Sequence, residues 1–372
     1  MKKTWSMRRP DQNDTLVFAL WAFGVFAVPL LLVRGWPTNL ADRDFAGVWA
    51  AGKLAIAGHG AQAFDVDALR ATAKKLAGTA PTIKITYPYP PQALFIAVPL
   101  ALLPLIVAFW AWQAISLAVF YFAARPYLPP RFPSWLAILT PAALINIIFG
   151  QVGLFFGALW LFAFSGSAIA SAALGLKPHL GVLVAVDVLR RKRLLRTAIW
   201  SAAILGASAA IFGLDAWRAW LTGAVIPQLG HLSSGGNQYG VWFYQMTTPY
   251  LAYGLPGWAL FACAAIFLLT RRFDVFTAAT AAFLISPYGF HYDMTVVCLG
   301  FGLLLFRRWQ TLPPWQTFVC AMAFLVPLLV ALGTWIASPL LLLGLYVQTE
   351  NPIGTQGERR SSGENMKATT AG

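Results

Sequence analysis

Carboxylates are scarce in this chain. Of its 372 residues, 13 are Asp or Glu, against 27 Lys or Arg. Its glutamates are Glu350, Glu358 and Glu364, and all three lie in the polar C-terminal tail. Any carboxylate chemistry in the rest of the chain must therefore come from aspartate, which leaves few candidates for an acid or a base.

Cysteines and short nucleotide or metal motifs are also lacking. The three cysteines, Cys263, Cys298 and Cys320, lie in apolar runs and have neither metal-ligand spacing nor a disulfide pattern. We interpret them as small buried hydrophobic residues. The sequence contains no GxGxxG, P-loop, CxxC or HExxH motif. We therefore expect no metal site and no cofactor.

Charged residues of both signs are few, and apolar residues dominate. Charged residues make up 11% of the chain and hydrophobic residues 59%, whereas a soluble domain has about 25% and about 45–50%. This composition predicts an all-α polytopic membrane protein, a single helical bundle of about 10–12 membrane segments. The net charge of +14 comes from short clusters between apolar runs. Such clusters are typical of cytoplasmic loops, so we expect no nucleic-acid partner.

The apolar runs mark the expected membrane segments. They lie near residues 16–33, 92–103, 105–124, 135–149, 152–164, 168–189, 197–212, 256–270, 275–286, 294–306, 315–332 and 335–347. Those at 92–103, 152–164 and 275–286 are short enough for half-spanning or broken helices. No small-residue cleavage site follows the first run, so we expect it to be a retained signal anchor.

The distribution of Lys and Arg predicts a topology. If every run crosses a plasma (inner) membrane, the basic residues 1–15 and the tail 348–372 are cytoplasmic. Residues 16–347 form the membrane domain, with extracytoplasmic loops at 34–91, 213–255 and 286–293. The same map places the turn 150–151 inside and, against the charge bias, the loop 125–133 with its two arginines outside. The tail is rich in Gly, Ser, Thr and charge, so we expect it to be disordered.

Asp42 and Asp44 lie in the first extracytoplasmic loop. Apolar residues at helical spacing follow them, and we expect short interfacial helices beginning at Phe45 and Val66. A carboxylate in this position can take the proton from an attacking hydroxyl. Alternatively, Asp44 caps the helix that begins at Phe45. Asp42 is the secondary candidate, since a second negative charge would raise the pKa of its neighbour.

Tyr288, His291 and Tyr292 lie in the loop 286–293 and are candidates for binding a phosphate at the membrane surface. The alternative is that the tyrosines belong to an interfacial aromatic belt and that His291 pairs with Asp293.

Lys177 interrupts the apolar run 168–189 and is followed by the helix-breaking Pro178. A lysine this deep in an apolar segment is costly, which makes it a candidate partner for a phosphate. The alternative is a structural lysine that bonds backbone carbonyls. Gln151 follows Gly150 at the junction of two runs and is either a site residue or part of a tight turn.

Several short motifs occur in a characteristic order along the chain. They are Asp44-Phe45, Trp49-Ala50-Ala51-Gly52, Tyr89-Pro90-Pro91, Gly150-Gln151, Lys177-Pro178-His179, Ser286-Pro287-Tyr288 and Tyr292-Asp293. In this combination, over residues 16–345, the chain resembles the family 87 glycosyltransferases. These are integral membrane enzymes of the GT-C superfamily and include polyprenyl-phosphate-mannose-dependent mannosyltransferases.

The resemblance implies an inverting hexosyltransferase that works at the extracytoplasmic face without a metal. Its donor is expected to be a polyprenyl-phosphate sugar, with mannose as the hexose, and its acceptor a lipid or a glycan. By the same resemblance Asp44 is the catalytic base and His291 holds the donor phosphate. We expect Lys177, Asp42, Tyr288, Tyr292 and Gln151 to complete the substrate site, and membrane lipids to surround it.

Two other classes of membrane protein fit the composition. A transporter or lipid flippase is disfavoured because no Asp or Glu lies clearly within an apolar run, and because no internal repeat is recognisable. A polysaccharide polymerase or ligase is disfavoured because the outer loop 213–255 contains one arginine, Arg218.

Overall fold

The computed structural model describes residues 12–32, 40, 43–77, 85–226, 249–330 and 332–353. Within these ranges the chain forms α-helices, short 3-10 segments, one π-helical segment at Leu221–Val225 and no strand, so the prediction of an all-α protein is confirmed. Three helical segments are long and apolar enough to cross a membrane: Leu105–Tyr127, Leu194–Phe212 and Ala252–Arg271. Shorter apolar helices are also present, and two of them, Gly153–Phe164 and Val275–Ile285, pack against the first and the third of these segments. The protein is an all-α membrane protein.

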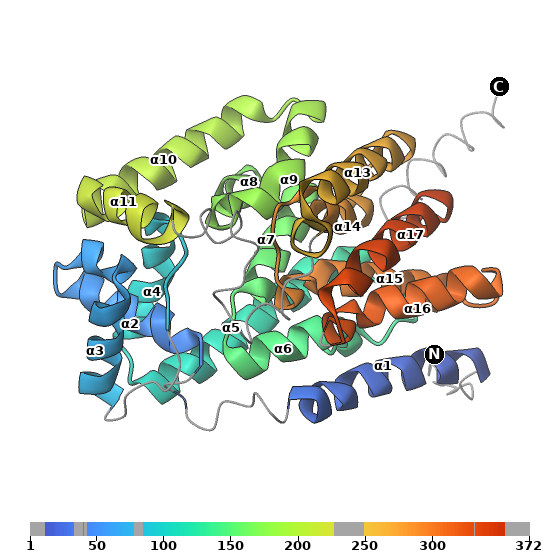
Figure 1. Cartoon of the computed structure of the whole chain (residues 1–372), viewed down its shortest axis with the longest axis horizontal. Helices are drawn as coiled ribbons and strands as arrows, with labels where there is room; N and C mark the ends of the chain where they lie inside the picture. Colours follow the sequence, from blue (N-terminus) through green and yellow to red (C-terminus); the bar gives the residue numbers. More distant parts are fainter. Residues whose placement is uncertain are drawn as a thin grey trace, which may run out of the picture.

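Figure 1 shows the helices in their spatial arrangement. They are α1 (Gln12–Leu32), α2 (Phe45–Ile56), α3 (Val66–Ala77), α4 (Leu94–Ala101), α5 (Leu105–Ala124), α6 (Pro141–Phe149), α7 (Gly153–Phe164), α8 (Ala168–Ala173), α9 (Pro178–Arg190), α10 (Leu194–Phe212), α11 (Leu214–Trp220), α13 (Pro249–Arg271), α14 (Val275–Ile285), α15 (Thr295–Arg308), α16 (Pro314–Leu329) and α17 (Ala337–Glu350).

One end of the bundle gathers many of the basic side chains, and we call it the basic end. Its basic residues are Arg125, Arg131, Arg190, Arg191, Lys192, Arg193, Arg196, Arg271, Arg272, Arg307 and Arg308. Contacts join segments that are distant in the sequence. Arg307 donates a hydrogen bond to the carbonyl of Tyr127 at 3.4 Å, and the Tyr127 hydroxyl lies 3.0 Å from Ser165 Oγ. The ring of Phe164 lies 5.9 Å from that of Phe273. The ends of α5, α7, α9, α13 and α15 therefore meet at one end of the bundle.

The helices of the first loop cap the opposite side of the molecule. In Figure 1, α2, α3, α4 and α11 gather at one end, while α13 to α17 lie towards the other. The predicted helices at Phe45 and Val66 are present as α2 and α3. However, α2 is almost entirely buried. It packs against α4 so closely that a side chain at Gly52 would collide with the backbone of Ala97. Between α3 and α4, the residues from Tyr87 to Pro90 are not helical, since each proline disfavours helix in the residue before it.

Two details of the predicted topology are wrong. The turn 150–151, expected inside, lies beside Asp44, because Gln151 bonds its carboxylate. The loop 125–133, expected outside, begins at the basic end, where Tyr127 contacts Ser165. The two arginines that opposed the charge bias thus join the other basic residues.

The physical reason is that two apolar runs were miscounted as crossings. The run 92–103 forms α4, which has eight residues and stays beside α2. The run 168–189 is a hairpin: α8 and a 3-10 segment lead away from the basic end to Lys177, and α9 returns to Arg190. Neither run takes the chain to the other end of the bundle, so two predicted crossings are lost and the two errors cancel after residue 190. Apolar composition does not distinguish contact with lipid from contact with protein.

Two helices with one end at the basic end are shorter than a bilayer core is thick. The helix α7 has 12 residues and α14 has 11, which at 1.5 Å per residue is about 16–18 Å. A bilayer core is about 30 Å thick. Helices of this length with one end at the basic end stop well short of the far side of a bilayer core. At the C-terminus, α17 continues three residues past the predicted boundary at 347, and residues 354–372 of the predicted tail lie outside the described residues.

Candidate active site

Asp44 immediately precedes α2, and its side chain lies beside the turn that follows α6. Its backbone is already helical, and its side chain forms no cap on α2, so the capping alternative is wrong. The carboxylate instead accepts a hydrogen bond from the side-chain amide of Gln151. Next to it, Arg43 donates to the carbonyl of Ile148, and its guanidinium lies 4.9 Å from the centre of the Phe109 ring. Asp44 is therefore fixed in place from both sides.

The turn after α6 requires glycine. Gly150 has φ +70°, and a Cβ there would lie 2.6 Å from the Cβ of Phe45. A side chain at this position would therefore be strained in its backbone and would push the start of α2 away. The close approach brings Gln151 next to Asp44. Gln151 is thus more than part of a tight turn.

The amide of Gln151 is oriented by its other contacts. Its Oε1 accepts a hydrogen bond from the Tyr89 hydroxyl at 3.2 Å, and its backbone carbonyl accepts one from Trp112 Nε1 at 3.2 Å. With Oε1 occupied by a donor, the Nε2 group faces Asp44 as a donor. Tyr89 therefore positions Gln151, and Gln151 positions the carboxylate.

The surroundings of Asp44 tune its proton affinity. Burial raises the pKa of the Asp44 carboxyl to about 6, while the hydrogen bond from Gln151 and the positive charge of Lys177 act in the opposite direction. A carboxylate with a pKa near 6 is ionised at neutral pH. It nevertheless binds a proton more readily than an exposed aspartate, as a general base requires.

Lys177 forms a buried ion pair that the sequence did not reveal. It lies between a 3-10 segment and α9, and Pro178 is the first residue of α9, as expected for a helix break. Its Nζ lies 2.7 and 2.8 Å from the two carboxylate oxygens of Asp293. The predicted alternative of a lysine bonding backbone carbonyls is replaced by this carboxylate partner. Asp293 was not among the predicted site residues. It follows Tyr292 in the loop 286–293, which the predicted topology places on the same side of the membrane as Asp44, and this position could have pointed to it.

Aromatic rings enclose the ammonium group of Lys177. Its Nζ lies 5.0 Å from the ring centre of Tyr292 and 5.7 Å from that of Tyr89. Tyr89 is thus shared, because its hydroxyl orients Gln151 and its ring faces Lys177. The carboxylate of Asp44 and the Lys177–Asp293 pair consequently belong to one site.

The loop 286–293 contributes buried side chains and is anchored from α6. Asn146 donates a hydrogen bond to the carbonyl of Tyr292 and accepts one from the backbone amide of Leu154 at 3.1 Å. Tyr292 and His291 are buried, which contradicts an interfacial belt role for this tyrosine. Tyr288 stacks on His179 with ring centres 4.0 Å apart, farther from Asp44 along the same loop. Both oxygens of Asp293 accept hydrogen bonds from Lys177, and the pairing of His291 with Asp293 stays a prediction.

The structure brings together most of the predicted site residues. Among the predicted residues, the cluster comprises Asp44, Gln151, Lys177, His291 and Tyr292, with Tyr288 at its edge. The residues of the cluster that were not predicted are Tyr89, Asp293 and the anchoring Asn146. Asp42 lies outside the described residues. In the described part of the chain, no group of three His, Cys, Asp or Glu side chains could hold a metal ion. The cluster offers a carboxylate base, a fixed cation and aromatic faces, which suits a sugar joined to a phosphate.

Comparison with known proteins identifies the family. No curated protein and no solved structure matches the chain. The family model for glycosyltransferase family 87 matches residues 87–287, more than half of the chain. The matched segment contains Tyr89, Gln151 and Lys177, while Asp44 and Asp293 lie on either side of it. An all-α membrane fold is consistent with the GT-C superfamily. The chain belongs to glycosyltransferase family 87, and it is a membrane glycosyltransferase.

Proposed function

We propose that this glycosyltransferase moves a hexose, with mannose as the expected sugar, from a polyprenyl-phosphate donor to a hydroxyl group of a lipid or glycan acceptor. The observation that carries the proposal is the placement of Asp44. Its carboxylate is fixed by Gln151, has a pKa raised to about 6 and lies within the electrostatic reach of Lys177. A base and a cation are the two groups that this transfer needs.

In the proposed reaction, the acceptor oxygen attacks the anomeric carbon while its proton passes to Asp44. The new carbon–oxygen bond forms as the bond between the anomeric carbon and the phosphate oxygen breaks. The bonding electrons leave with the polyprenyl phosphate, whose growing negative charge the site must stabilise. A single displacement from the face opposite the phosphate inverts the anomeric configuration.

Lys177 and His291 are the proposed partners of the leaving phosphate. Lys177 is held in position by both oxygens of Asp293, and the rings of Tyr292 and Tyr89 shield it from water. In such an environment a cation interacts with a phosphate more strongly than in water. We assign Tyr288 and Tyr292 to the walls of the same donor site.

We place this reaction at the extracytoplasmic face of the plasma (inner) membrane. The proposal is supported by the separation of Asp44 from the basic end, which by the positive-inside rule faces the cytoplasm. Both chain termini are then cytoplasmic, since α1 leads away from the N-terminal basic residues and α17 ends beside Arg271, which pairs with Glu350 at 3.5 Å.

A transfer assay tests the proposal. The purified protein is incubated with synthetic polyprenyl-phosphate mannose and a lipid extract from cells that lack the protein, and the products are analysed by mass spectrometry. We expect one added hexose on a specific lipid or glycan, with an anomeric configuration opposite to that of the donor. In proteoliposomes, movement of the lipid-linked sugar across the bilayer without a new glycosidic bond would instead identify a flippase.

Gln151→Leu is expected to shift the pH dependence of transfer. Wild-type kcat/KM should fall as the pH drops below about 6, because protonated Asp44 cannot accept the acceptor proton. The hydrogen bond from Gln151 lowers the Asp44 pKa, so its loss raises that pKa and moves the acid limb to higher pH. Rate profiles from pH 5 to 9 measure the shift. Gln62→Leu, an exposed residue of the first loop, is the control, and an unmoved limb in Gln151→Leu argues against the positioning role.

His291→Ala is expected to weaken donor binding. If the buried imidazole donates to the donor phosphate, its loss removes a charge-assisted hydrogen bond and should raise the donor KM by about tenfold. The acceptor KM should change little. Titration of the polyprenyl-phosphate sugar in the transfer assay measures both constants. His59→Ala is the matched control, because His59 is exposed in the first loop; equal donor KM values for His291→Ala and wild type would return His291 to a structural role.

A further inference from the structure

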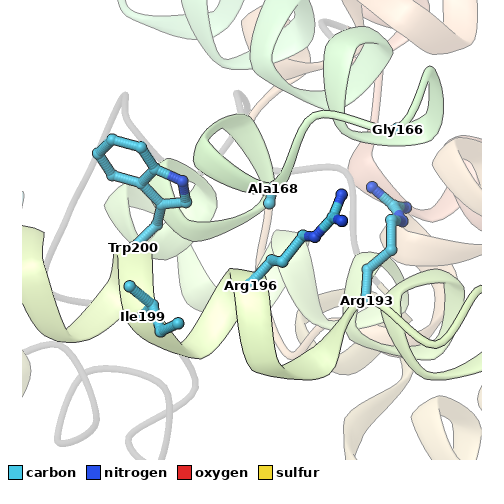
Figure 2. Close-up of a pocket in the computed structure, with 6 residues that line it drawn as sticks. All are labelled: Gly166, Ala168, Arg193, Arg196, Ile199 and Trp200. Carbon is cyan, nitrogen blue, oxygen red and sulfur yellow. The ribbon is translucent and has the colours of Figure 1, made fainter.

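A cavity lies at the basic end, away from Asp44. It has a volume of about 320 Å³ and opens between the α7–α8 turn and the first turns of α10. Figure 2 shows its lining residues, Gly166, Ala168, Arg193, Arg196, Ile199 and Trp200. The side chains of Arg193 and Arg196 extend from the start of α10 towards the α7–α8 turn. The transfer reaction proposed for Asp44 does not use this cavity.

Arg193 is fixed in the wall of the cavity but is not fully hydrogen-bonded. Its Nη2 pairs with the carboxylate of Asp187 and donates to the carbonyl of Ala163 at 3.2 Å. Its Nε and Nη1 are buried and have no hydrogen-bond partner among the described residues. Buried donors without acceptors are costly. An acceptor from outside the protein would relieve that cost.

The first turn of α10 adds further donors. The amide of Thr197 makes the first bond of this helix, to the carbonyl of Arg193 at 3.0 Å, so the amides of residues 194–196 have no partner within the helix. The Thr197 hydroxyl is also buried without a partner in the described part of the chain. Arg196, in the same turn, places a positive charge at the positive end of the helix dipole, which is unfavourable unless an anion lies there.

The charge around the cavity favours an anion. Arg190, Arg191 and Lys192 immediately precede Arg193, and Asp187 is the one acidic residue in the sequence from 178 to 214. Asp187 is already engaged by Arg191 at 2.8 Å and by Arg193. The local field is therefore strongly positive and attracts negatively charged headgroups.

The apolar surroundings indicate that the anion carries hydrocarbon chains. The segment Leu194–Phe212 is long and apolar enough to span a membrane, and its side chains are largely unburied by protein. Leu195 is 74% exposed and Ile199 59%. Trp200 lies with Ile199 in the cavity wall, and tryptophan favours the boundary between headgroups and acyl chains. A lipid phosphate can thus occupy the cavity while its chains lie along α10.

We propose that this cavity is a binding site for the phosphate of an anionic phospholipid at the basic end of the bundle. Arg193 and Arg196 bind the phosphate, the first turn of α10 donates to it, and Trp200 and Ile199 contact the glycerol and acyl chains. The site is separate from the transfer reaction and requires only that the protein be embedded in a membrane.

Lipid titration of the purified full chain in detergent tests the proposal. The unfolding midpoint is followed as short-chain phosphatidylglycerol, short-chain phosphatidylcholine or inorganic phosphate is added. We expect phosphatidylglycerol to raise the midpoint of the wild type and the other two to leave it unchanged. Arg196→Gln should raise the apparent Kd for phosphatidylglycerol about fivefold, the effect of one basic residue at a membrane surface.

Arg308→Gln is the matched control, since Arg308 is another exposed arginine of the basic end that does not line the cavity. It should bind phosphatidylglycerol as the wild type does. Arg196→Lys keeps the charge, and its apparent Kd for phosphatidylglycerol should lie between those of Arg308→Gln and Arg196→Gln. If Arg196→Gln does not fold, Arg196→Lys serves as the test variant in its place. Equal affinity in Arg196→Gln and Arg308→Gln overturns the site, and an equal response to inorganic phosphate overturns its assignment to a lipid.

Discussion

Asp44→Asn is expected to lower the rate of sugar transfer by about 10²–10⁴-fold while leaving the fold intact. Asparagine has the shape of aspartate, and its side-chain oxygen can still accept the hydrogen bond from Gln151. It cannot, however, accept the acceptor proton near neutral pH. The loss should appear in kcat, because the base acts on the acceptor only as the new bond forms.

The measurement is steady-state transfer from polyprenyl-phosphate mannose by purified wild-type and variant protein, with the unfolding midpoint of each determined in parallel. Asp65→Asn is the matched control. Asp65 is another aspartate of the first loop, and its carboxylate accepts a hydrogen bond from the amide of Ala68 at the start of α3. It should retain activity. Wild-type kcat in Asp44→Asn would exclude Asp44 as the base.

Breaking the Lys177–Asp293 pair is expected to have the largest effect on stability. Both side chains are buried, with relative exposures of 7% and 1%. Lys177→Met leaves the Asp293 carboxylate buried without its cation, and Asp293→Asn leaves the ammonium of Lys177 without its anion. Removal of one partner from a buried pair costs about 3–5 kcal/mol. Each single variant should therefore unfold at a markedly lower temperature or denaturant concentration.

The double variant Lys177→Met with Asp293→Asn separates stability from function. With no uncompensated charge left, it should recover most of the lost stability. It should nevertheless stay inactive, because no ammonium group remains to stabilise the leaving phosphate. Unfolding in detergent and transfer activity are the two measurements. Full activity in the double variant would assign the pair to the fold alone.

An exposed ion pair provides the comparison for the Lys177 and Asp293 variants. Arg271 and Glu350 lie 3.5 Å apart at the basic end, and both are about half exposed. Loss of such a pair costs about 0–1 kcal/mol, because water solvates each charge in the absence of the other. Arg271→Gln should therefore change stability little. A similar loss in Arg271→Gln and Lys177→Met would mean that burial does not explain the effect.

Individual helices were predictable where an apolar run is bounded by clear signals. The run at 105–124 coincides with α5, since Pro104 precedes it and Arg125 follows it. The run at 197–212 lies within α10 and ends at Gly213, whose φ of +84° stops the helix. The direction of some segments was not predictable, because α4 is as apolar as a membrane-crossing helix yet packs against α2.

The candidate site also has residues that the sequence reveals and residues that it does not. Asp44 and Lys177 are conspicuous in the sequence, because an aspartate is rare here and a lysine inside an apolar run is costly. Their partners are not conspicuous. Gln151 is 107 residues from Asp44, and Asp293 is 116 residues from Lys177. Tyr89, which contacts both Gln151 and Lys177, stands between two prolines, and no pattern in the sequence links it to either of them.

The sequence by itself determined that this protein is an all-α membrane protein, and the scarcity of acids together with the family resemblance singled out an aspartate as the candidate base. The first follows from composition and local pattern, which set what each segment can bury. The tertiary structure alone decided that the turn at Gly150 meets Asp44, that Asp293 neutralises Lys177 and that the arginines of the loop 125–133 join the basic end. These contacts depend on how helices pack, and hydrophobicity does not specify which apolar surface a helix covers.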